Sequence, residues 1–199
     1  MLAARRFDKL AADANSIAGL SEAAFEDIAD AELAVAGAVR AALSRDHDLA
    51  LAAVERATTV SPNAAVVLGF DALTRCLCGD HEKAIARAEK AMQLSPLEPL
   101  VYYAAFACGF ASILTGRSEE AVAYARKAIE GNRNFAFSYC VLALGCARLG
   151  QREEAARAVR RLAVAAPGFR IEALSKIRFA DAALLQPELA LLRAAQLPD

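Results

Sequence analysis

A repeat of 34 residues is the feature of this sequence that most restricts its fold. Pro62 and Pro96 each follow a serine at the end of an apolar stretch and stand 34 residues apart, and Gly116 and Gly150 show the same spacing. Segments that recur at such a period form similar units that stack on one another, because one unit cannot bury its apolar face alone. We therefore expect the chain to be a solenoid.

The residue types predict that each unit is built from helices. Apolar residues make up 57% of the 199 residues, alanine is abundant, and the chain has no tryptophan. The β-branched residues are scattered rather than alternating, which favours helix over strand. We predict an all-α fold, an α-solenoid of helix-turn-helix units that form a right-handed superhelix.

Four repeats align when their small residues are superimposed. Position 20 is then alanine in every repeat, at Ala50, Ala84, Ala121 and Ala155. Small side chains at a fixed position allow the two helices of a repeat, and the next repeat behind them, to approach closely. The sequence predicts repeats at residues 31–64, 65–98, 102–135 and 136–169, with helical caps at 1–30 and 170–199.

Turn residues separate the two expected helices of most repeats. Gly79, Gly116 and Gly150 stand where a left-handed residue can end the first helix without a steric penalty. Two turns depart from the pattern, because Arg45 occupies the glycine position of the first repeat and Arg133 occupies the proline position of the third. The ends of these two helices are therefore the least defined by the sequence.

Several stretches resemble a known family. AIARAEKAMQLSPLEPLVYY, GRSEEAVAYARKAI and NFAFSYCVLALGCARLGQREEA are similar to bacterial tetratricopeptide repeats over about residues 31 to 169. SPLEPLVYY and AAQLPD further resemble the C-terminal repeat region of bacterial adenylate cyclase-type and related transcriptional regulatory proteins. The resemblance implies a regulatory or scaffolding module that binds proteins. The alternative is the C-terminal regulatory fragment of a signalling enzyme, such as a nucleotide cyclase, whose catalytic domain lies outside this chain.

No group of residues suggests catalysis or cofactor binding. The two histidines, His47 and His81, fall at expected helix starts, and no phosphate-binding glycine loop or nucleophile elbow is present. The five cysteines are an odd number without CxxC spacing, which argues against disulfides and zinc. We predict a protein that is not an enzyme and has no catalytic residue, cofactor or metal.

Charge and hydropathy restrict the classes of partner that we expect the chain to bind. The net charge of −1 gives no general attraction for nucleic acid, although the stretch from Arg148 to Arg178 carries eight bases and three acids. No apolar run is long enough to span a membrane, and the N-terminus lacks the apolar core of a signal peptide. We expect a cytoplasmic protein that uses neither a membrane nor a nucleic acid as its partner.

The family resemblance implies a concave groove lined by positions 2, 5, 9 and 12 of each first helix. The predicted groove residues come from these positions, with Phe70 beside them: Val66, Phe70, Leu73, Tyr103, Phe106, Phe110, Ile113, Phe137, Cys140 and Leu144. The set contains no lysine or asparagine to hold a carboxylate, so an apolar helix or peptide is favoured over a charged C-terminal tail. A second copy of the chain is another candidate occupant. The alternative is that the chain's own segment from Phe179 to Leu197 fills the groove.

Overall fold

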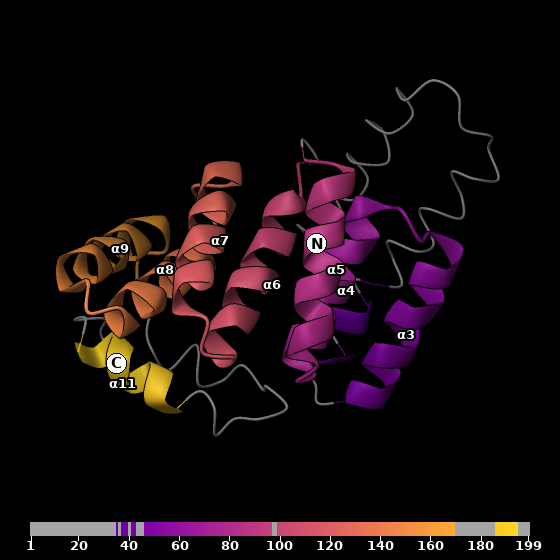
Figure 1. The fold of residues 1–199 in the computed structure, drawn as a ribbon, viewed down its shortest axis with the longest axis horizontal. Coiled ribbons are helices and arrows are strands. Elements are labelled where there is room, and N and C mark those ends of the chain that lie inside the picture. The colour runs from indigo at the N-terminus through magenta and orange to yellow at the C-terminus, as the bar shows by residue number, and fades with distance from the viewer. Residues whose placement is uncertain are drawn as a thin grey trace.

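The chain folds into a row of antiparallel helices. The computed structural model describes residues 35, 37–39, 41–42, 46–96, 99–169 and 186–194, and every regular element within them is a helix. The helices are α3 (His47–Val60), α4 (Ala65–Leu77), α5 (His81–Leu94), α6 (Val101–Leu114), α7 (Ser118–Gly131), α8 (Ala136–Arg148), α9 (Arg152–Ala165) and α11 (Gln186–Ala194). Figure 1 shows them in chain order from α3, in indigo, to α9, in orange. The predicted all-α solenoid is confirmed.

Parts of the expected repeat array lie outside this description. The predicted cap at 1–30 falls entirely outside the described residues, and so do most of residues 31–45 and much of the second cap at 170–199. Three helical hairpins are described in full, namely α4–α5, α6–α7 and α8–α9. The division into four repeats stays a prediction.

The three hairpins turn at the glycines that the sequence singled out. Gly79, Gly116 and Gly150 have φ angles of 87°, 81° and 73°, a conformation that is costly for residues with a Cβ atom. At each turn the next residue donates its N–H to a carbonyl five residues earlier, as Asp80 does to Arg75 at 2.9 Å. This hydrogen bond closes a Schellman motif, which satisfies carbonyls that the ending helix leaves unpaired.

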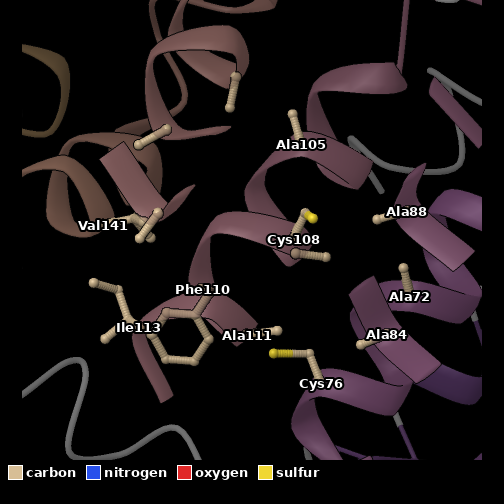
Figure 2. Close-up of a cluster of buried hydrophobic side chains, with 14 of the residues drawn as sticks. Ala72, Cys76, Ala84, Ala88, Ala105, Cys108, Phe110, Ala111, Ile113 and Val141 are labelled. Atoms are coloured by element: carbon tan, nitrogen blue, oxygen red, sulfur yellow. The ribbon is translucent and has the colours of Figure 1, made fainter. Parts of the chain in front are cut away.

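Small residues set the distance between neighbouring helices. Ala84 and Ala121 are completely buried, and Figure 2 shows Ala84 and Ala88 of α5 facing Cys108 and Ala111 of α6. A Cβ atom added at Gly109 would lie 3.3 Å from the Ala121 carbonyl oxygen. The backbones of α6 and α7 therefore approach so closely that alanine and glycine are required at their contact.

A buried ion-pair cluster fastens α4 to α5. The Asp71 carboxylate of α4 is fully buried; its Oδ1 accepts a hydrogen bond from Arg75 Nε at 2.7 Å, and its Oδ2 forms an ion pair with Arg87 Nε of α5 at 3.0 Å. Burial raises the pKa of Asp71, and the two arginines act against that rise. Arg75 also contacts Asp80 at 3.2 Å and Glu55 of α3 at 3.7 Å. The cluster therefore joins three consecutive helices.

Helix α11 packs against α8 (Figure 1). Its Leu192 side chain is 1% exposed and belongs to the same buried cluster as Ile113 and Leu144. Part of the segment from Phe179 to Leu197, the alternative occupant of the groove, therefore contributes to the core. Among the described residues, no helix is both long and apolar enough to cross a membrane.

Candidate functional site

An uninterrupted set of aromatic rings extends from α4 to the residues that follow α9. We call this set the aromatic face; its members are Phe70, Tyr102, Tyr103, Phe106, Phe110, Phe135, Phe137 and Phe169. Each ring lies within contact distance of at least one other ring of the set. The face therefore bridges α4, α6 and α8, the first helices of three consecutive hairpins.

The ring geometry matches favourable aromatic packing. Phe70 of α4 lies 5.2 Å from Tyr103 of α6, measured between ring centroids, and Tyr103 lies 5.2 Å from Phe135. Phe137 of α8 meets Phe169 edge-on at 5.6 Å. Aromatic pairs at 4.5 to 7 Å in tilted or edge-to-face arrangements contribute about 0.5–1.5 kcal/mol beyond the area they bury. The rings thus stabilise one another and hold a fixed surface.

Six of the eight rings keep part of their surface exposed. Tyr102 and Phe110 are buried, at 5% and 6% exposure. The half-buried rings are Phe70, Tyr103, Phe106, Phe135, Phe137 and Phe169. A connected group of rings that is incompletely covered is the kind of apolar surface that marks a binding site.

The structure divides the ten predicted groove residues into two groups. Val66, Phe70, Leu73, Tyr103, Phe106 and Phe137 are half-buried. The other four are core residues: Phe110 is 6% exposed, Ile113 0%, Cys140 3% and Leu144 1%. Phe110 and Leu144 occupy position 9 of their repeats, Ile113 position 12 and Cys140 position 5, and all four join the buried cluster that includes Leu192 of α11. These four side chains pack in the core beneath the half-buried residues and do not line an open groove.

Phe135 and Phe169 of the aromatic face are absent from the predicted groove residues. Phe135 is the N-cap residue of α8, and Phe169 follows Gly168 after the end of α9. Both stand at position 34 of their predicted repeats, just outside the helix positions that the groove template includes. An aromatic residue at the same position in two consecutive repeats is the signal that could have identified them.

Reactive chemistry is not prominent in the described part of the chain. Burial raises the pKa of the Cys76 and Cys140 thiols, and that of Cys108 to about 12, so these groups stay protonated. His47 and His81 are the first residues of α3 and α5. Among the described residues, no three or more histidine, cysteine or carboxylate side chains lie together in a group able to hold a metal ion.

Comparison with known proteins identifies the fold. The structure of MamA matches with a TM-score of 0.56 and 22% identity, covering 79% of this chain and 91% of that one. PilW, a widely conserved type IV pilus biogenesis factor, matches with a TM-score of 0.62 and 20% identity over 83% of this chain and 73% of that one. YrrB, a tetratricopeptide-repeat protein with an unusual peptide-binding site, matches with a TM-score of 0.53 and 18% identity over 81% and 82%. This chain has the tetratricopeptide-repeat fold.

Comparison by sequence identifies no similar protein, whereas comparison by structure does. No protein-family model and no curated protein matches the sequence. The tetratricopeptide-repeat fold is therefore visible in the helix arrangement and in the repeat of small residues rather than in overall sequence identity.

Proposed function

We propose that this chain is a protein-interaction module whose aromatic face binds an apolar helix or extended peptide of a partner protein. The observation that carries the proposal is the connected set of six half-buried rings from Phe70 to Phe169. Full burial of a large exposed apolar side chain contributes about 1.5–3 kcal/mol, and covering a half-buried ring contributes a part of that. Contact with a few of these rings therefore suffices for measurable affinity.

The chemistry of the face favours an apolar ligand over a charged one. The eight residues of the aromatic face are all phenylalanine or tyrosine, so no side chain of the face offers a fork of donors to a carboxylate or a phosphate. A charged C-terminal tail and a nucleic acid are accordingly poor ligands for this face. YrrB is described as having an unusual peptide-binding site, which supports peptide binding as a use of the same fold.

Two finer proposals accompany the first. A second copy of the chain is an alternative occupant of the aromatic face, and light scattering of the purified protein distinguishes a dimer from a monomer. The proposal that the chain is the C-terminal regulatory part of a signalling enzyme, such as a nucleotide cyclase, rests on the stretches SPLEPLVYY and AAQLPD. A cytoplasmic location is part of the same proposal.

The experiment that tests the function is selection from a random peptide library displayed on phage. We expect the selected peptides to be rich in leucine, isoleucine and aromatic residues at helical or alternating spacing. Isothermal titration then compares the parent protein with the Phe106→Ala and Phe137→Ala variants. A matched control is Leu94→Ala, which removes an apolar side chain that is 45% exposed at the end of α5.

The two variants of the aromatic face should bind each selected peptide at least about tenfold more weakly, equivalent to 1.4 kcal/mol. The Leu94→Ala control should bind like the parent protein. Selected peptides that are predominantly charged, or that bind all four proteins equally, contradict the proposal.

A further inference from the structure

A pocket separate from the aromatic face lies where α7, α8 and α9 meet. Its volume is about 600 Å³, within the range of pockets that accept a small ligand or the side chains of a bound peptide. None of the eight rings of the aromatic face lines it. The pocket therefore offers a surface that the proposed function does not use.

One part of the pocket lining is apolar and incompletely covered. Ile129 of α7 and Leu142 of α8 line the pocket and are half-buried. Val164, near the end of α9, lines it with a side chain that is 73% exposed. Because this valine is so open to water, a ligand that covers it binds with a more favourable free energy.

The other part of the lining is basic. Arg126, Arg133 and Arg161 line the pocket together with a single acid, Glu130. Arg126 is engaged by Glu154 at 2.9 Å. Within the part of the chain that the structure describes, no carboxylate pairs with the Arg133 or Arg161 guanidinium. A guanidinium without a carboxylate partner presents a planar fork of donors that matches a carboxylate ligand.

The turn that carries Arg133 is held in place. The Asn132 side chain accepts a hydrogen bond from the Asn134 N–H at 3.0 Å, and the Tyr139 hydroxyl donates to the Arg133 carbonyl at 3.1 Å. In the preceding predicted repeat, Pro96 stands at the position of Arg133 and stops the helix. In the third repeat, these two hydrogen bonds fix the turn instead. Arg133 therefore projects from a fixed backbone, which reduces the entropy that binding would cost.

We propose that this pocket binds an acidic segment of a partner protein, with a carboxylate between Arg133 and Arg161 and an adjacent apolar side chain on Val164. Charge complementarity selects this occupant, because three arginines and one carboxylate line the pocket. The juxtaposition of apolar and basic lining selects a segment in which leucine or a similar residue neighbours aspartate or glutamate.

The test uses a fluorescently labelled synthetic peptide of alternating glutamate and leucine, with binding followed by fluorescence anisotropy. The double variant Arg133→Gln, Arg161→Gln should bind this peptide at least about tenfold more weakly than the parent protein. Arg56→Gln is the matched control, because Arg56 is an exposed arginine of α3, at the other end of the row of helices, and does not line the pocket. It should bind within about twofold of the parent, as expected for a distant exposed charge.

Further arms separate this proposal from its alternatives. A peptide with glutamine in place of glutamate should bind at least about tenfold more weakly to the parent protein. The Val164→Ser variant should bind the glutamate peptide more weakly than the parent protein does. The proposal is overturned if the double variant matches the parent or if the glutamine peptide binds equally well. It is also overturned if a labelled single-stranded oligonucleotide binds more tightly than the peptide and loses affinity in the same double variant.

Thermal melts of all variants establish that they are folded at the temperature of measurement. Phe106→Ala should keep full affinity for the glutamate peptide, since the aromatic face and the pocket share no residue. Failure of this proposal and failure of the proposed function are therefore distinguishable.

Discussion

The Phe106 ring meets the Phe135 ring edge-on, with centroids 5.1 Å apart and ring planes at 86°. Phe106 belongs to α6 and Phe135 precedes α8, so the contact joins two hairpins across the intervening α7 in the sequence. A double-mutant cycle with Phe106→Ala and Phe135→Ala should give a coupling free energy of about 0.5–1.5 kcal/mol, the typical value for such pairs. Urea unfolding measures it. Strict additivity would show that the rings do not interact.

The buried small residues make a second prediction. Ala121→Leu should lower the free energy of unfolding by about 1–3 kcal/mol, because Ala121 is fully buried against the close approach of α6 and α7. Ala123→Leu is the control, since Ala123 is exposed on the same helix, and it should change stability by less than about 0.5 kcal/mol. Chemical denaturation compares the two variants. Equal effects would contradict the helix contact described here.

The ion-pair cluster supplies a prediction with an internal control. Asp71→Ala should destabilise the protein by about 3–5 kcal/mol, because it leaves the buried guanidinium of Arg75 without its closest carboxylate. Glu55→Ala removes an exposed carboxylate 3.7 Å from the same arginine and should cost less than about 0.5 kcal/mol. Thermal and urea unfolding provide both values. A small effect of Asp71→Ala would mean that the cluster does not fasten α4 to α5.

The thiol of Cys78 gives a prediction about pH. Burial raises its pKa to about 11 from a usual value of 9.0, with Arg75 acting against the rise and Asp80 adding to it. The deprotonated thiolate is the form that reacts with iodoacetamide, and the raised pKa reduces the fraction of thiolate. Reaction at neutral pH should therefore be about a hundredfold slower in the folded than in the unfolded chain. The rate should rise about tenfold per pH unit until the pH approaches about 11. Mass spectrometry of the labelled peptide checks both. A rate that levels off near pH 9 would show that the folded site leaves this thiol unperturbed.

The repeat framework could be predicted from the sequence because local and packing requirements coincide there. Gly79, Gly116 and Gly150 are needed for left-handed turns, and the alanines are needed where helices touch. Both requirements restrict single residues at fixed positions. They therefore leave a visible period in one sequence.

The candidate site was predicted only in part, because exposure depends on tertiary packing. Ile113 and Leu144 share a helix face with half-buried residues, yet the packing of α6, α8 and α11 covers them. Phe135 reaches the aromatic face from a cap position, which a helix-based template omits. The pocket between α7 and α9 depends on how neighbouring hairpins are placed, and nothing in the spacing of Arg133 and Arg161 reveals that placement.

Site-specific photo-crosslinking tests the central claim, that the aromatic face is the surface that holds a partner. Benzoylphenylalanine replaces Phe106 or Phe137 of the aromatic face, or Ala123 on the exposed side of α7 as the control. Each protein is irradiated with a peptide from the library selection, and mass spectrometry identifies the products. We predict crosslinks to the peptide from positions 106 and 137 and none from position 123. Crosslinks from position 123 alone would contradict the account.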